Sequence, residues 1–569
     1  MRKLPQIVNA EQQEQRQPVG RIIAVVGGVV VAASSFLPWA YGAEAVDDMT
    51  VLGYPSPLQI FAALLGVMVA VFALLGPAAR LGQRRLGWNR GAKAAAVGVL
   101  FFVAVIVGSI ALELGGLINV VYGGWVALVG ALVAFVGTRL MIVGRDPNLA
   151  AAATPAWVGI FGIAAAMGAV LFAAFYGLGQ DDPGTFVAFI VFAIAVVLVL
   201  FRLGVMAWLS TVTARHRKVL ILAAFLTAFA FPFTQGGSDA NMSIATQVLI
   251  FAATALGLNI VVGLAGLLDL GYIAFLGAGA FTAAILSDSV FTTIDWHPPF
   301  IVVVLISGAV SGTLGLIIGT PTLRVSGDYL AIVTLAFGEI FRFGMINLDG
   351  QDGPDLTNGS NGIPGVPDLN LFGFDFKDSH SILGLELGRF SNYYFLLLVL
   401  IALIILIFAR LNNSRIGRGW VAIREDEKAA EAMGVNVFGL KLFAFASGAF
   451  LAGVAGSIKA HHDISVTPDQ YIFLESAFLL AAVVLGGMGT ILGVLVGATL
   501  LKLMPEKLRF VDEYRLLIFG LLLVIMMRFR PEGLVASRRR QLEFHDDDED
   551  LADKIQSEII ETEPARGTT

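Results

Sequence analysis

Five polar side chains stand inside long apolar stretches of the sequence: Asn259, Asp269, Glu339, Arg342 and Glu475. A polar or ionisable group is costly in hydrocarbon and normally faces the interior of a helix bundle or a water-filled cavity. We therefore expect these residues to line a path through a membrane. For Glu339 and Arg342, which are three positions apart, a structural salt bridge on one helix face is the alternative. For Asp269 and Glu475, the alternative is solvation at a membrane edge.

A charged loop between two apolar stretches forms the second candidate site. Between Arg410 and Leu442 it contains Arg424, Glu425, Asp426, Glu427, Ala429, Ala430 and Gly434. Asp426 can cap a short helix that ends at Gly434, because Asp accepts backbone hydrogen bonds at helix starts and Gly favours helix ends. Such a helix has no lipid to bury in and would expose Ala429, Ala430 and Met433 to a docking partner. An ordinary solvated loop is the alternative.

The sequence offers little for catalysis or for holding a metal. It has no cysteine, which excludes disulfides and thiolate sites. The cluster His461-His462-Asp463 is too short to predict a metal site, and the Asp-rich stretch 347–392 lacks EF-hand spacing. No Gly-x-x-x-x-Gly-Lys-Ser/Thr motif is present to cradle ATP phosphates, and no nucleophile and base are paired. We expect no enzyme activity, no metal and no cofactor in this chain.

The composition identifies the environment of these residues. The chain has 569 residues, of which 57% are hydrophobic and only 14% charged, and its mean hydropathy is +0.82. Soluble domains have about 25% charged residues. The net charge is −6, without the basic excess that nucleic-acid binding requires. A soluble enzyme and a nucleic-acid binder are excluded, and a polytopic membrane protein is predicted.

About sixteen apolar stretches are long enough, or nearly so, to cross a hydrocarbon layer of about 30 Å as helices. The predicted fold class is therefore an all-α polytopic membrane protein. The stretches are 22–41, 57–76, 94–114, 117–136, 155–178, 186–201, 219–233, 244–262, 270–286, 300–319, 330–346, 394–408, 442–460, 473–485, 491–503 and 516–527. The short arms 473–485 and 491–503 flank a glycine-rich turn, so they form either a hairpin or a re-entrant pair.

Charge predicts the orientation of the chain. Loops rich in Lys and Arg should be cytoplasmic, and these are 2–21, 80–93, 139–145, 215–218, 415–428 and 528–540. The loops between them are acidic or neutral. The alternation places both termini in the cytoplasm, provided that residues 473–503 enter the membrane and return.

Four regions are predicted along the chain. Residues 1–21 form a cytoplasmic segment, 22–214 a region of six spans, 215–535 a second membrane domain, and 536–569 an acidic tail. The tail is poor in aromatic residues and cannot bury enough apolar surface to become ordered, so a disordered cytoplasmic tail is expected.

Several stretches of the second domain resemble one family of membrane proteins. They are GLNIVVGLAGLLDLGY at 257–272, GDYLAIVTLAFGEI at 327–340, NGSNGI at 358–363, REDE at 424–427, ESAF at 475–478, VLGGMG at 484–489 and RPEGL at 530–534. In this order they resemble the LivM-type permeases of branched-chain amino acid ABC importers. The resemblance covers about residues 220–535. Lys428-Ala429-Ala430 and Gly434 also resemble the Glu-Ala-Ala-x-x-x-Gly signature by which ABC permeases engage their ATPases, with the glutamate displaced to Glu427.

The resemblance implies a fold, a function and a set of partners. It implies ATP-driven import of Leu, Ile and Val by alternating access across the bacterial cytoplasmic (inner) membrane. The implied partners are a second permease of similar fold, two ABC ATPase subunits that bind ATP and Mg, and a periplasmic or surface substrate-binding protein. Uptake of urea or short amides is an alternative within the same class. An ion-coupled secondary transporter is the alternative from another class, with Asp269, Glu339 and Glu475 as coupling sites.

Overall fold

The computed structural model describes residues 4–507 apart from 43–47, 77–79, 82–83, 142–153, 181, 292–293, 323–328, 352 and 383, together with 514, 517, 520–521, 523–525, 528 and 533–535. The predicted acidic tail at 536–569 lies outside the described residues, and so do Met1 to Lys3 and most of the stretch 530–534. The described chain divides into two compact units, one formed by residues within Met1–Asn241 together with Lys507, and the other by residues within Met242–Glu506 and after Val511.

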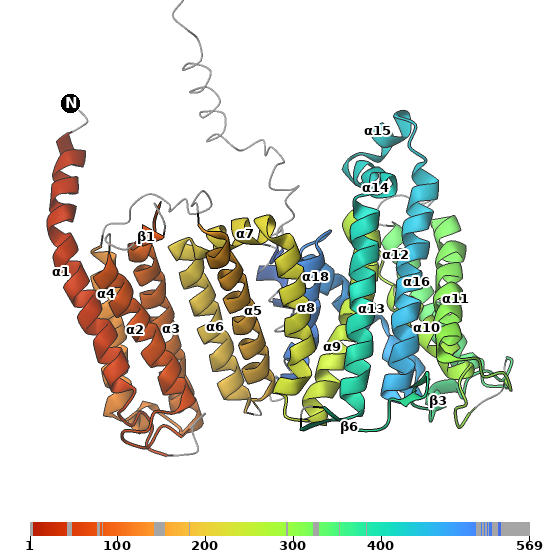
Figure 1. Ribbon diagram of the computed structural model, residues 1–569, viewed down its shortest axis with the longest axis horizontal. Helices are drawn as coiled ribbons and strands as arrows, with labels where there is room; N and C mark the ends of the chain where they lie inside the picture. The colour runs from red at the N-terminus through yellow and green to blue at the C-terminus, as the bar shows by residue number, and fades with distance from the viewer. Residues whose placement is uncertain are drawn as a thin grey trace, which may run out of the picture. The chain divides into compact units, whose positions relative to one another are not determined.

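The first unit is a helical bundle with one short hairpin (Figure 1). Its elements are α1 (Leu4–Ser34), α2 (Pro57–Leu75), β1 (Arg80–Leu81), β2 (Arg84–Arg85), α3 (Trp88–Glu113), η1 (Leu117–Asn119), α4 (Tyr122–Arg139), α5 (Ala156–Leu178), α6 (Pro183–Leu203), α7 (Val205–Arg215) and α8 (Arg217–Thr234). Ser56 begins α2 with a capping box to Gln59. The helix α7 was not predicted. Because α8 packs against α5 and α7, this unit extends past the boundary predicted at residue 215.

The second unit holds both sites proposed from the sequence. Its helices are α9 (Asp239–Leu258), η3 (Asn259–Leu264), α10 (Ile273–Ile285), α11 (Phe300–Thr322), α12 (Tyr329–Asn347), η4 (Gly359–Asn361), α13 (Arg389–Asn412), α14 (Arg415–Glu425), α15 (Glu427–Ala432), α16 (Val437–Asp463), η5 (Pro468–Tyr471), α17 (Phe473–Gly486) and α18 (Ile491–Lys507). The segment η3 is a π-helix that continues α9.

Three short antiparallel strand pairs lie at one end of this unit among the described residues. The strand β3 (Ile363–Pro364) pairs with β8 (Ser465–Val466), β4 (Asn370–Leu371) with β5 (Phe374–Asp375), and β6 (His380–Ile382) with β7 (Leu385–Leu387). Figure 1 shows β3 and β6 at one end of α13 and α16, and α14 and α15 at the opposite end. The loop around α15 and the strand-rich loop therefore lie at opposite ends of the second unit.

The core of the second unit is organised around α16, which packs against both α10 and α11. Glycines allow this close approach. A Cβ atom at Gly279 of α10 would overlap the backbone of Gly453 in α16, and one at Gly456 would overlap the backbone carbonyl of Leu276. Small residues that let helix backbones meet are typical of membrane helix interfaces. Close packing therefore accounts for these glycines.

Thirteen helices among the described residues are long and apolar enough to cross a membrane. The remaining three predicted stretches fall on α10 with 13 residues, on α18 with 17 residues, and on the partly described segment 514–528. Every predicted stretch that the structure describes in full thus coincides with a helix. The chain is an all-α polytopic membrane protein, as its composition predicted.

Candidate functional site

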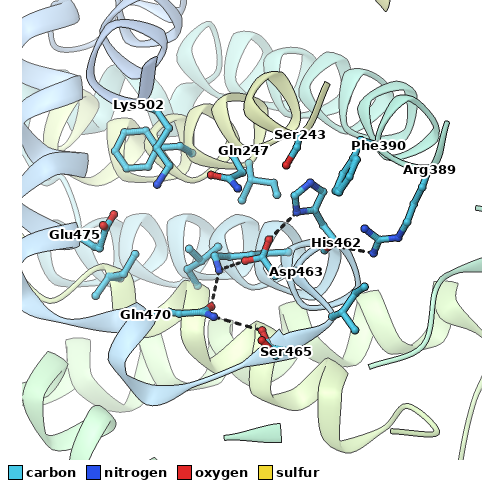
Figure 2. Close-up of a pocket in the computed structure, with 16 residues that line it drawn as sticks. Ser243, Gln247, Arg389, Phe390, His462, Asp463, Ser465, Gln470, Glu475 and Lys502 are labelled. Atoms are coloured by element: carbon cyan, nitrogen blue, oxygen red, sulfur yellow. Dashed lines mark hydrogen bonds and ion pairs between the residues drawn. The ribbon is translucent and has the colours of Figure 1, made fainter. Parts of the chain in front are cut away.

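A cavity of about 480 Å³ opens within the second unit (Figure 2). Its walls come from α9, α10, α13, α16, α17 and α18, together with the segment that follows α16. It lies where α13 begins and α16 ends, at the end of the unit that carries β3 and β6. Charged, polar and apolar side chains all face this cavity.

One wall of the cavity is a network of paired charges. Lys459 donates hydrogen bonds to the carboxylate of Asp463 at 2.5 Å and to the side-chain oxygen of Gln470 at 2.7 Å. The other carboxylate oxygen of Asp463 lies 2.6 Å from Nδ1 of His462. Arg389 forms an ion pair with Asp368 and donates a hydrogen bond of 2.9 Å to the carbonyl oxygen of His462. These charges are therefore neutralised within the protein, and His462 and Asp463 belong to a hydrogen-bonded network.

Two further charges in the cavity have no such neutralisation. Among the described residues, no side-chain hydrogen bond or ion pair is formed by Glu475, near the start of α17, or by Lys502, on α18. Both side chains line the cavity, and Figure 2 shows them at one end of it, away from Arg389. Nζ of Lys502 lies 5.8 Å from the centre of the Phe251 ring, within the range of a cation–π contact. Of the five predicted path residues, Glu475 is the one that lines this cavity.

Glu339 and Arg342 lie on α12 and form the salt bridge that their spacing suggested. Their side chains approach to 3.7 Å, and Arg342 makes a second ion pair of 2.7 Å with Asp469 in η5. Neither residue lines the cavity. This geometry fits the structural alternative for the pair.

Asn259 and Asp269 are buried, and their side chains form hydrogen bonds with backbone groups of neighbouring turns. The side-chain oxygen of Asn259 accepts a hydrogen bond of 2.8 Å from the amide of Gly489, and its Nδ2 donates one of 3.3 Å to the carbonyl of Thr490. Asn259 thus holds the glycine turn between α17 and α18 against the π-helix. Asp269 accepts a hydrogen bond of 2.9 Å from the amide of Gly271 in the turn before α10. Neither of these two predicted path residues lines the cavity.

The helix predicted in the charged loop is present as α15. Asp426 is its N-cap, and its Oδ1 accepts a hydrogen bond of 3.0 Å from the amide of Ala429. Gly434 follows the helix with φ +82°, a conformation that glycine adopts without steric cost. The predicted capping residue is confirmed, and the helix ends at Ala432, shortly before Gly434.

The expected exposure of this helix was wrong in one respect. Ala429 is exposed and Met433 is 84% exposed, but Ala430 is only 5% exposed. Successive residues of a helix point about 100° apart. Because α15 packs against α14 and α16, Ala430 faces the protein when Ala429 faces outward. A docking surface on α15 therefore consists of Ala429 and Met433 without Ala430.

An ion pair and a hydrogen bond connect the charged loop to the rest of the unit. Glu427 forms an ion pair of 2.6 Å with Lys441 near the start of α16, which gives the displaced glutamate a structural partner. Arg424, in the last turn of α14, donates a hydrogen bond to the carbonyl oxygen of Gly263 in the π-helix. Glu425, by contrast, is exposed. The loop is thus connected to the membrane-embedded helices through both Glu427 and Arg424.

Sequence reasoning missed part of the cavity, namely Ser243, Gln247, Lys459 and Lys502. Lys459 and Lys502 lie within the predicted stretches 442–460 and 491–503, so the rule that identified Glu475 applies equally to them. Ser243 and Gln247 are neutral residues four positions apart on α9 and carry no comparable signal. Among the described residues no group of three His, Asp or Glu side chains could hold a metal ion.

Comparisons with known proteins agree on one family. The family model described as "Branched-chain amino acid transport system / permease component" matches residues 241–527. The permease protein LivM of the high-affinity branched-chain amino acid transport system of Salmonella typhimurium is 40% identical over 340 residues, which cover 57% of this chain and 76% of LivM. LivM of Escherichia coli K12 is 39% identical over 338 residues, with the same coverage of both chains. LivH, a permease protein of the same kind of system in E. coli K12, is 30% identical over 128 residues, which cover 22% of this chain and 41% of LivH. No solved structure matches the chain.

Proposed function

Because the chain belongs to the family of permease components of branched-chain amino acid transport systems, we propose that it carries Leu, Ile and Val inward in an ATP-driven importer. The chain is a multi-pass membrane protein and a transport subunit. The observation that carries the proposal is that the family match, residues 241–527, includes every residue lining the cavity. A cavity lined by charges of both signs and by apolar side chains suits an amino acid with an apolar side chain.

The importer requires partners. We propose a second permease of similar fold, since both LivM and LivH of E. coli resemble this chain. Two ATPase subunits bind ATP and Mg, because the sequence has no phosphate-binding loop of its own. A substrate-binding protein outside the cell delivers the amino acid.

The proposed orientation places both termini and the loop with α14 and α15 in the cytoplasm of a bacterium, with the helices in its inner membrane. The basic residues of the loop support this placement. Since α16 begins at this loop and ends at Asp463 beside the cavity, the cavity then faces the outside. It is in position to receive an amino acid from a binding protein.

The proposed coupling surface is the outer face of α15. Ala429 and Met433 present it to an ATPase, while Asp426 and Gly434 shape the helix ends. Movement at α15 passes to the membrane through Arg424, which contacts the π-helix. Asn259 extends the connection to the glycine turn before α18. Within this scheme Asn259 and Asp269 support the path, and Glu475 lines it.

Uptake in proteoliposomes tests the function. The full chain is reconstituted with its second permease, its ATPases and its binding protein, and uptake of labelled L-leucine and of urea is measured with ATP inside the vesicles. We expect leucine uptake that requires ATP and persists without any ion gradient. A matched preparation with an ATPase partner that binds but does not hydrolyse ATP is the control. Uptake driven by an ion gradient without ATP would contradict the proposal, and so would uptake of urea in place of leucine.

A further inference from the structure

The cavity contains two charges of opposite sign for which no described residue supplies an ion-pair partner. Lys459, Asp463 and Arg389 are engaged in ion pairs. The side chains of Glu475 and Lys502 form no ion pair among the described residues, although both line the same cavity. Both residues are partly buried. Withdrawing a charge from water is unfavourable unless a partner compensates for it, so an unpaired acid and an unpaired base in one cavity indicate a ligand that supplies both partners.

The cavity also offers an apolar surface beside these charges. Ile250 and Phe251 of α9 and Ile273 and Leu276 of α10 line it. Phe251 lies directly beside the ammonium group of Lys502. A ligand that reaches Lys502 with an anionic group therefore places its adjoining atoms against Phe251 and its apolar neighbours. The volume of about 480 Å³ falls within the range of about 300–1,000 Å³ typical of small-molecule sites.

We propose that this cavity binds the zwitterionic head group of the amino acid during transport, with Glu475 accepting hydrogen bonds from its ammonium group and Lys502 donating them to its carboxylate. Ile250, Phe251, Ile273 and Leu276 receive the aliphatic side chain. This inference rests on the proposed function and adds a second recognition step inside the permease, after the binding protein. The site is partly open and carries one residue for each charged group, so it binds the amino acid weakly enough to release it.

Ligand analogues that lack one charge test the two roles separately. The full chain, assembled with its permease and ATPase partners in nanodiscs, is studied without binding protein, so that binding reports the membrane site alone. The probes are L-leucine, leucinamide, whose carboxylate is a neutral amide, and 4-methylpentanoate, which lacks the amino group. Binding is measured by equilibrium dialysis with labelled probes.

Each variant should affect only the probes that carry the matching group. Glu475→Gln should lower the affinity for L-leucine and leucinamide about tenfold, because a hydrogen bond between charged groups is lost. The affinity for 4-methylpentanoate should stay unchanged. Lys502→Gln should lower the affinity for L-leucine and 4-methylpentanoate about tenfold and leave the affinity for leucinamide unchanged. Lys502→Arg should keep the binding of 4-methylpentanoate. The exposed residues Glu386 and Lys377, outside the cavity, provide the matched controls Glu386→Gln and Lys377→Gln, which should leave all three affinities unchanged.

Failure of this inference is distinguishable from failure of the proposed function. If both cavity variants bind L-leucine with the affinity of the wild type, or lose affinity for all three probes equally, the assignment of the zwitterion site is wrong. ATP-driven leucine uptake by the wild-type complex, measured on the same preparation with binding protein added, decides the proposed function by itself. Wild-type uptake together with unchanged binding in the variants would overturn only the zwitterion site.

Discussion

Arg424 and Gly263 are 161 residues apart in the sequence, yet Nη1 of Arg424 donates a hydrogen bond of 2.6 Å to the carbonyl oxygen of Gly263. Arg424 stands at the end of α14, next to the proposed docking helix, and Gly263 belongs to the π-helix that continues α9. Single turns of π-helix inside α-helices are rare and occur frequently at functional sites. The contact therefore joins the loop that holds α14 and α15 to an apolar segment whose backbone hydrogen bonds depart from the α pattern.

Removing the Arg424 guanidinium should weaken coupling. Arg424→Gln loses a hydrogen bond from a charged group, worth about 1.5–3 kcal/mol. We expect leucine uptake in proteoliposomes to fall more than ATP hydrolysis, so that fewer amino acids are carried per ATP. The matched control is Arg415→Gln, since Arg415 is exposed at the start of the same helix. An unchanged ratio of uptake to hydrolysis in Arg424→Gln would contradict transmission through this contact.

Asn259 should be important for stability. Asn259→Leu leaves the partly buried amide of Gly489 and carbonyl of Thr490 without their side-chain partner, at a cost of up to about 1–3 kcal/mol for each group that water does not reach. We expect a lower midpoint of thermal unfolding for the purified chain, measured by intrinsic fluorescence. A midpoint equal to that of the wild type would show that water or a backbone shift replaces both hydrogen bonds.

A bulky side chain should affect ATPase docking at one position of α15 and the stability of the chain at the next. Ala429 is exposed, so Ala429→Trp should leave the thermal stability of the chain unchanged and prevent ATPase docking, measured by co-purification of the ATPase subunits. Ala430 is buried, so Ala430→Trp should lower stability by about 1–3 kcal/mol through overpacking. Normal ATPase co-purification and normal uptake in Ala429→Trp would rule out α15 as the docking helix.

The absence of cysteine allows a direct test of orientation. Met433 is 84% exposed and Phe372 is 92% exposed, so single cysteines at these positions are accessible to label. On intact cells, a membrane-impermeant maleimide should label Phe372→Cys and should label Met433→Cys only after the membrane is opened. Labelling of Met433→Cys in intact cells would show that α15 faces the outside and would contradict the proposed topology.

A chain that starts at Ala214 should retain part of its ATP-dependent leucine uptake. This truncation keeps α8 and the basic residues Arg215, Arg217 and Lys218 that are proposed to hold its start in the cytoplasm. The truncation removes α5 and most of α7, against which α8 packs, but only 11% of the α8 span is buried inside the protein, so we expect α8 still to insert. Uptake by the truncated chain is compared with uptake by the full chain at equal membrane levels. Complete loss of uptake, despite normal insertion and assembly, would show that the first unit belongs to the transport machinery.

The local features of this protein followed from its sequence. Apolar stretches predicted the membrane helices, because a helix in hydrocarbon satisfies its own backbone hydrogen bonds whatever its neighbours are. Asp426 and Gly434 predicted the ends of a short helix within two residues, because caps involve residues that are close in the chain. The spacing of Glu339 and Arg342 predicted a salt bridge, because residues three apart share a helix face.

The partners of distant residues were decided by the tertiary structure. Ala430 was expected on the exposed face of α15, and its burial depends on the neighbouring helices α14 and α16. Asn259 was predicted as a path residue, and the structure shows that its side chain holds the glycine turn at Gly489, which lies 230 positions away. Glu475 and Lys502 line one cavity because the tertiary structure brings α17 and α18 to it together with α9 and α10. Polarity in an apolar stretch predicts that a side chain avoids lipid, but whether it meets a carbonyl, a counter-ion or a cavity depends on which helices pack beside it.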